Sequence, residues 1–176
     1  MRTQLSLTLP LLFTIAVLGD SAAGLRWTAP AGWKNEGARP MRAATYVVAA
    51  APGDQANAEC VVYFFGEGQG GPVEANLERW KGQFHTRDGK PAAAQIAKRS
   101  SHGLTVTTID TSGEYSGMGG PVAAQHQPAS GYRLLGAIVE GPHGNLFVKF
   151  TGPGKTIAAN QGKFEQLVGS FEREHY

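Results

Sequence analysis

A glycine-rich stretch in the first half of the chain has the spacing of a phosphate-binding motif. Gly66, Gly68 and Gly71 match G-x-G-x-x-G, the pattern with which dinucleotide-binding folds hold a pyrophosphate, and Asp88 follows about 20 residues later. That fingerprint requires a parallel strand directly after the following helix. Residues 86–91 (Thr-Arg-Asp-Gly-Lys-Pro) and the Ala-rich run after them make a poor buried strand. The sequence therefore argues against a dinucleotide, and we predict no cofactor.

A simpler form of the same chemistry stays open. Backbone N–H groups of a glycine loop at the start of a helix can bind an anion without a dinucleotide fold. The residues of such a site would be Gly66, Gly68, Gln69, Gly70 and Gly71. The alternative is that these glycines only let the chain turn sharply from a strand into a helix.

Catalytic and metal-binding patterns are missing from the sequence. The five histidines are His85, His102, His126, His143 and His175. No two of them stand three or four residues apart, and the single cysteine, Cys60, cannot build a thiolate zinc site. No G-x-S-x-G motif is present. We predict no catalytic residue and no metal ligand; a hydrolase would need His102, Asp110 and His143 to converge from loops.

A long irregular stretch, residues 112–131, is the second candidate for function. It holds five glycines and two prolines, and loops longer than about 12–15 residues in compact domains are often functional or disordered. Aromatic, methionine and arginine side chains are enriched at interfaces. Those in or beside this stretch are Tyr115, Met118, Tyr132 and Arg133, which we predict to bind a ligand or partner. The alternative is a hairpin tip with no binding role.

Hydrophobic periodicity predicts the elements that position these residues. Val73, Leu77, Trp80 and Phe84 recur with helical spacing, which predicts a helix over Pro72–Phe84. A second apolar stripe predicts a helix over Lys155–Phe171. The main predicted strands cover residues 41–50, 60–65, 92–98, 103–110, 132–140 and 146–151.

The strand pattern indicates an α+β fold. Residues 60–65 and 132–140 are apolar on both faces, as in strands that are covered on both sides. Short turns between consecutive strands favour antiparallel pairing. We therefore predict an antiparallel β-sheet flanked by two α-helices, in an α/β/α-type sandwich.

The chain start has the layout of a secretory signal peptide. Met1-Arg2 supplies a positive charge, an apolar run follows to Gly19, and Ser21-Ala22-Ala23-Gly24 offers a small-residue cleavage site. We predict a signal peptide over 1–24, a single domain over 25–171, a fraying polar tail over 172–176, and a secreted or periplasmic protein. No later segment is long and apolar enough to span a membrane.

The 176-residue length fits one domain, and a formal charge of +2 gives no electrostatic case for nucleic acid. The mature chain opens with Trp27, Pro30 and Gly32-Trp33 and closes with Val168-Gly169-Ser170-Phe171. In these features it resembles the PsbP-like α/β sandwich family. Longer stretches of its amino-acid sequence resemble exported bacterial proteins with no assigned activity. That family includes accessory subunits of photosystem II and a Ran-binding import factor, which work by binding.

The resemblance and the lack of a catalytic pattern together favour an exported, non-catalytic binding or accessory protein. Its partner would be a protein or a small ligand, and the oligomeric state is left open. Two alternatives remain: an anion-binding protein that uses the loop Gly66–Gly71, and a hydrolase with a site assembled from loop His, Ser and Asp residues.

Overall fold

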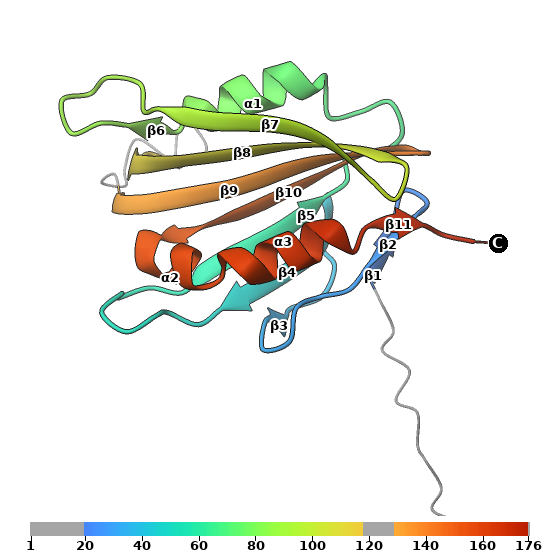
Figure 1. Cartoon of the computed structure of the whole chain (residues 1–176), viewed down its shortest axis with the longest axis horizontal. Helices are drawn as coiled ribbons and strands as arrows, with labels where there is room; N and C mark the ends of the chain where they lie inside the picture. Colours follow the sequence, from blue (N-terminus) through green and yellow to red (C-terminus); the bar gives the residue numbers. More distant parts are fainter. Residues whose placement is uncertain (1–19, 118–128, 176) are drawn as a thin grey trace, which may run out of the picture.

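The structure is a computed structural model that describes residues 20–117 and 129–175. Its centre is an antiparallel sheet in the order β3-β4-β5-β10-β9-β8, with β6 and β7 both paired to the outer side of β8 (Figure 1). The strands are β3 (Lys34–Asn35), β4 (Arg42–Val48), β5 (Ala58–Tyr63), β6 (Phe84–His85), β7 (Ala94–Ser101), β8 (Leu104–Tyr115), β9 (Ala129–Gly141) and β10 (Gly144–Pro153). A small second sheet has the order β1 (Asp20–Ala22), β2 (Leu25–Trp27) and β11 (Glu172–Arg173).

The helices cover both faces of the main sheet, which confirms the predicted α+β sandwich. On one face, α2 (Gly154–Ala159) and α3 (Gln161–Gly169) bury Ile157, Phe164 and Leu167 against the sheet (Figure 1). On the other face, α1 (Val73–Lys81) buries Leu77 and Trp80. Strands β5, β9 and β10 contribute to both cores, so their loss of apolar–polar alternation has the predicted cause.

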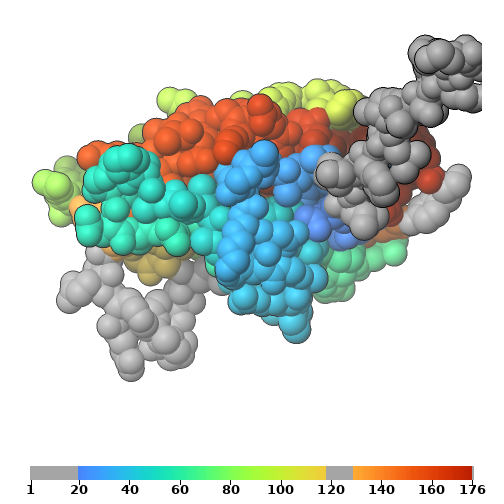
Figure 2. Space-filling model, turned by 90° about the horizontal axis from the view of Figure 1, so that it is seen from below, coloured from blue at the N-terminus to red at the C-terminus, as the bar shows by residue number. Residues whose placement is uncertain are grey.

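The N-terminal third of the chain packs beside the C-terminal helices. The loop after β4 contacts the start of α2, where Asp54 Oδ2 accepts hydrogen bonds from the backbone N–H and the hydroxyl of Thr156 at 2.8 and 2.6 Å. Figure 2 shows this loop, in teal, next to the orange residues of α2. Trp33 Nε1 donates to Asn160 Oδ1 at 3.2 Å, which fixes the junction between α2 and α3.

Both predicted helices end differently from the prediction. The first stops at Lys81, and Phe84 lies in strand β6 opposite Tyr115. Phe84 has the spacing of a helical apolar residue because its side chain is buried in the same core as that of Trp80. The second predicted helix is divided at Asn160, whose backbone leaves the helical region and whose Nδ2 donates to Thr156 O. A side-chain amide that bonds to the backbone in this way competes with the helix.

Two predicted irregular segments are partly regular. β8 continues to Tyr115 and β9 begins at Ala129, so the ends of the stretch 112–131 are paired strands; Met118 lies outside the described residues. The tail was expected to fray, but Glu172 and Arg173 form β11 against β2. The Glu172 carboxylate accepts from Arg26 Nε at 2.9 Å across that pair, which stabilises the added strand.

The predicted leader lies mostly outside the described residues, and its cleavage stays a prediction. The expected cleavage points, after Ala23 or Gly24, fall in the turn between β1 and β2, where both residues have positive φ. Cleavage there would remove β1, whose Asp20 carboxylate accepts hydrogen bonds from Tyr46 Oη and Asn35 Nδ2. Within residues 20–117 and 129–175, no helix is both long and apolar enough to cross a membrane.

Candidate functional site

A cleft of about 360 Å³ opens between helix α1 and the β4–β5–β10 part of the sheet; we call it the α1 cleft. Its walls combine cationic and aromatic side chains from four segments of the chain. The cations are Arg42, Arg79 and Lys149, and the aromatic residues are Tyr63, Phe65, Trp80 and Phe147. No Asp or Glu side chain lines it among the described residues.

The cleft exists because α1 is short and is held over the far part of this face. Trp80 lies directly on Gly136 of β9, where an added Cβ would come within 2.6 Å of the indole ring. This close approach seats the helix against β8 and β9, where Leu77 and Trp80 pack with Ile109 and Leu134. The surface near β5 and β10 is therefore left without a helix above it.

Lys149 of β10 forms the floor of the cleft, and its side chain is almost completely buried (7% exposed). Its ammonium donates to Gln83 Oε1 at 2.6 Å and to Tyr115 Oη at 3.3 Å. The ammonium also lies 5.4 Å from the centre of the Tyr115 ring. Both partners are uncharged, and among the described residues no carboxylate lies within 4.0 Å of Lys149. The cleft therefore has a buried positive charge at its base.

This environment lowers the pKa of Lys149 to about 8, chiefly because burial disfavours the charged amine. The positive charge of Arg79 lowers the pKa further, and Glu59 opposes the shift. Burial also raises the pKa of the neighbouring Tyr115 to about 12, so its hydroxyl stays protonated at neutral pH. Lys149 remains mostly charged at pH 7.

The other two cations of the cleft, Arg42 and Arg79, differ in whether a carboxylate balances their charge. Arg42 forms an ion pair with Glu59 at 3.0 Å, and its guanidinium lies 5.6 Å from the centre of the Tyr63 ring. Arg79 is exposed on α1 and donates to the amide oxygen of Asn76, a neutral acceptor. Of the three, Arg79 and Lys149 are thus the cations without a carboxylate partner among the described residues.

The apolar part of the cleft is a run of packed rings that reaches the surface. Tyr63 and Phe65 are stacked, with ring centres 5.8 Å apart and planes inclined by 9°. Phe65 in turn contacts Phe147 with ring centres 5.5 Å apart. Phe65 is 36% exposed and Met41, at the cleft mouth, is 64% exposed. An apolar molecule that entered the cleft would cover both side chains.

The predicted glycine loop borders the α1 cleft, and its role as an anion site stays a prediction. Gly70 lies against Phe147 and Phe65, where an added Cβ would come within 2.7 Å of the Phe147 ring. The buried Asn76 amide donates to the carbonyls of Gly70 and Pro72 at 2.8 and 2.9 Å, which ties the loop to α1. Gly66, Gly68, Gly70 and Gly71 all have positive φ, so the loop needs glycine for its turns as well.

The structure separates the other predicted site residues. Tyr115 and Tyr132 lie together, stacked with centres 5.7 Å apart, and Tyr115 reaches Lys149. Arg133 belongs to the opposite face of the sheet, where it binds Asp110 at 2.9 and 2.7 Å and Gln161 at 3.1 Å. Only the two tyrosines therefore join the surroundings of the cleft.

The residues of the hydrolase alternative are not brought into one cleft. His102 and His143 lie in the β7–β8 and β9–β10 turns at one end of the sheet. Asp110 lies six residues along β8 from the strand start, about 20 Å away at the usual rise, and pairs with Arg133. Among the described residues no group of three His, Cys, Asp or Glu side chains could hold a metal.

Sequence reasoning missed Lys149, Arg79 and Phe65 as site residues. A signal for Lys149 was present: it follows Phe147 on the same face of a strand that is mostly apolar. A lysine in such a position must be buried or must line a cavity. No feature of the sequence marked Arg79 as a site residue, because its pattern was that of an ordinary exposed helix residue.

Comparison with known proteins places the fold. No protein-family profile matches the sequence, and no curated protein matches it. The solution structure of cyanobacterial PsbP (CyanoP) from Synechocystis is similar over 96% of this chain and 99% of that chain, with a TM-score of 0.51 and 13% identity. The PA94 protein of unknown function from Pseudomonas aeruginosa matches over 82% of this chain and 88% of its own, with a TM-score of 0.48 and 12% identity. The chain has the PsbP-like α+β sandwich fold.

Proposed function

We propose that this protein is an exported, non-catalytic binding module, and that the α1 cleft holds a small organic anion. The observation that carries the proposal is Lys149, a buried ammonium at the base of a cleft with aromatic walls, whose two hydrogen-bond partners are both uncharged. Export is supported by the leader-like pattern of residues 1–24.

Without a ligand, the buried charge of Lys149 costs the folded protein free energy. A buried charge that lacks a counter-ion is unfavourable, because hydrogen bonds to neutral groups replace only part of its hydration. An anion that entered the cleft would supply the missing counter-charge to Lys149 and would also approach Arg79. The bound anion would form a charge-assisted hydrogen bond, which is stronger than a bond between neutral groups.

The shape of the cleft selects against a bare inorganic ion. Phe65, Phe147 and Trp80 line the cleft together with Lys149. Small-molecule sites generally combine such apolar walls with a few placed polar groups that fix orientation. The ligand that matches the site therefore has an apolar body and one anionic end.

The proposal is tested by melting the protein in the presence of phosphate, acetate, hexanoate and phenylacetate at pH 7. We expect at least one of the two larger carboxylates to raise the melting temperature. At ten times the dissociation constant the gain is about 1.4 kcal/mol, or about 3–6 °C for a domain of this size.

Two lysine variants make the test specific. Lys149→Met should abolish the rise, because it removes the buried charge. Lys81→Met is the matched control: Lys81 is half-buried on α1, lies outside the cleft lining and pairs with Glu78 at 2.9 Å, so the rise should be unchanged. Equal melting temperatures in all four anions, or an equal rise in Lys149→Met, would show that the cleft is not an anion site.

A further inference from the structure

We propose, on the basis of the function proposed above, that the ligand of the α1 cleft is an aromatic carboxylate. Its carboxylate lies at Lys149, and its ring lies between Phe65 and Met41 at the mouth. Two features of the cleft point to this ligand: an unusual turn at the mouth and the placement of side chains along β10.

The turn Arg39–Arg42 holds Met41 in a costly conformation. Arg39 and Arg42 exchange two backbone hydrogen bonds of 2.9 Å, so Pro40 and Met41 are the central residues of a tight turn. Met41 has a φ of +64°, in the left-handed region that such turns normally give to glycine or asparagine. For a residue with a side chain this conformation lowers the folding equilibrium constant by about 5- to 30-fold.

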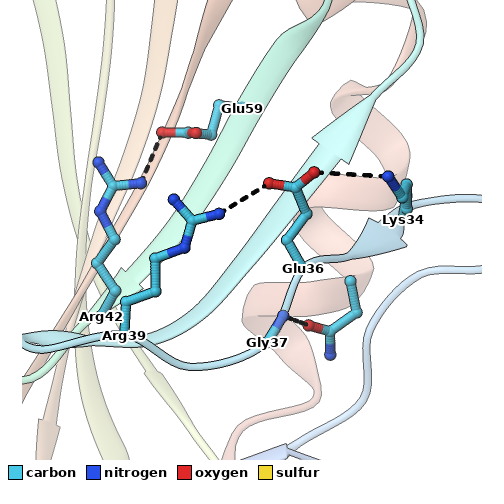
Figure 3. Close-up of polar contacts among 7 residues, drawn as sticks. Lys34, Glu36, Gly37, Arg39, Arg42 and Glu59 are labelled. Atoms are coloured by element: carbon cyan, nitrogen blue, oxygen red, sulfur yellow. Dashed lines mark hydrogen bonds and ion pairs between the residues drawn. The ribbon is translucent and has the colours of Figure 1, made fainter.

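The turn is also braced in a way that keeps Met41 at the mouth. Figure 3 shows Arg39 and Arg42 extending in the same general direction from the two sides of the turn. Arg39 ends at Glu36 (3.2 Å) and Arg42 at Glu59 (3.0 Å). The large apolar side chain between them is 64% exposed although it lines the cleft. Strained residues cluster at functional sites. A glycine in place of Met41 would remove the backbone strain, but it would also remove the side chain that lines the cleft.

Side chains along β10 connect the anion position with the aromatic rings. Lys149 and Phe147 point to the same face two residues apart, so their Cα atoms are separated by about 7 Å. Phe147 lies opposite Tyr63 in the adjacent strand and contacts Phe65. Lys149 and the rings of Phe147 and Phe65 therefore line neighbouring parts of one cleft, an arrangement that suits a carboxylate joined to a ring by a short linker.

The positive charge of Lys149 and the aromatic walls of the cleft narrow the chemical class of the ligand further. Of the two cleft cations without a carboxylate partner among the described residues, Lys149 is buried and Arg79 is exposed to solvent. A monoanionic carboxylate therefore matches the single buried charge at the floor better than a phosphate dianion does. Ring-on-ring contacts with Phe65 favour an aromatic over a saturated ring by about 2- to 10-fold in affinity. The Met41 thioether adds a favourable contact of similar size with an aromatic ring.

Calorimetry of the full chain with four probes separates these features. Phenylacetate has the ring and the charge, cyclohexylacetate has the charge and a saturated ring, 2-phenylethanol has the ring alone, and inorganic phosphate has charge alone. We expect phenylacetate to bind about 2- to 10-fold more tightly than cyclohexylacetate. We expect it to bind on the order of 10- to 100-fold more tightly than 2-phenylethanol, which cannot pair with Lys149.

The outcomes distinguish the two proposals. If cyclohexylacetate binds as tightly as phenylacetate, the aromatic class is wrong while the anion cleft stands. If phosphate binds more tightly than both, the carboxylate class is wrong and so is the preference for an organic anion, although the cleft still binds anions. If no anion binds, both proposals fail.

Two substitutions at Met41 test the role of the turn independently. Met41→Gly should raise the melting temperature, because it relieves the positive φ, and should weaken phenylacetate binding by about 2- to 10-fold. Met41→Ala keeps the strain, so it should weaken binding without a rise in melting temperature. Unchanged affinity in both variants would overturn the assignment of Met41 to the ligand.

Discussion

The pH dependence of stability provides a direct test of the buried Lys149 charge. Its pKa falls from 10.5 to about 8 in the folded protein, chiefly through burial. Between these two values the unfolded chain binds more protons than the folded protein, so the free energy of unfolding rises with pH in that window. Below pH 8 the full cost of the buried charge is present, and above pH 10.5 it is absent.

The size of this effect follows from the two pKa values. At about 1.4 kcal/mol for each pKa unit, the charge destabilises the folded protein by about 3 kcal/mol at pH 7. About 2.5 kcal/mol of this is recovered by pH 10. Lys149→Met has no amine to titrate, so its stability should lack this rise.

The assay is urea unfolding of wild type and Lys149→Met at pH 7, 8, 9 and 10. The difference between the two unfolding free energies cancels most other titrating groups, and the series stops below the raised pKa of Tyr115, about 12. We expect the wild type to gain about 2.5 kcal/mol relative to the variant between pH 7 and pH 10. A difference that stays constant within about 0.5 kcal/mol would refute the buried, uncompensated charge.

Other predictions concern packing, thiol chemistry and processing. Gly136→Ala should destabilise the protein by about 1–3 kcal/mol in urea unfolding, because the added methyl meets the Trp80 ring, whereas Gly162→Ala, which meets nothing, should stabilise α3 by up to about 1 kcal/mol. Cys60 is fully buried and its pKa is raised by burial, so a thiol reagent should label it only as fast as the protein unfolds; rapid labelling of the native protein would contradict this. N-terminal sequencing of the exported chain should give Gly24 or Leu25 as the first residue, and a chain that starts at Met1 would contradict export.

The fold was largely predictable because its signals are local. Apolar runs on both faces of β5 and β9 required cover on both sides, and short turns required antiparallel pairing. The break at Asn160 escaped prediction because the apolar stripe continues across it, while the contact that holds Asn160 in place comes from Trp33, which is distant in sequence. β11 escaped for a similar reason: Glu172 pairs with Arg26 only after the whole domain has folded.

The candidate site was much less predictable than the fold. The glycine loop and Tyr115 lie at or near the α1 cleft, but the cleft itself depends on how Trp80 seats α1 over Gly136. Lys149, Gln83 and Tyr115 come from three separate segments, which the β8–β9–β10 pairing and the pairing of β6 with β8 bring together. Such a constellation has no fixed spacing in the sequence, so no motif could reveal it.

The most direct test of the α1 cleft is the set of tryptophan side-chain signals in a ¹⁵N–¹H spectrum. The chain has three tryptophans, and only Trp80 lines the cleft, while Trp27 and Trp33 belong to the core on the other face. Titration with phenylacetate should move one indole signal, and Trp80→Phe should identify it by its loss. If the Trp80 signal stays fixed at saturating phenylacetate, or if Trp27 or Trp33 moves instead, the ligand does not bind in the α1 cleft.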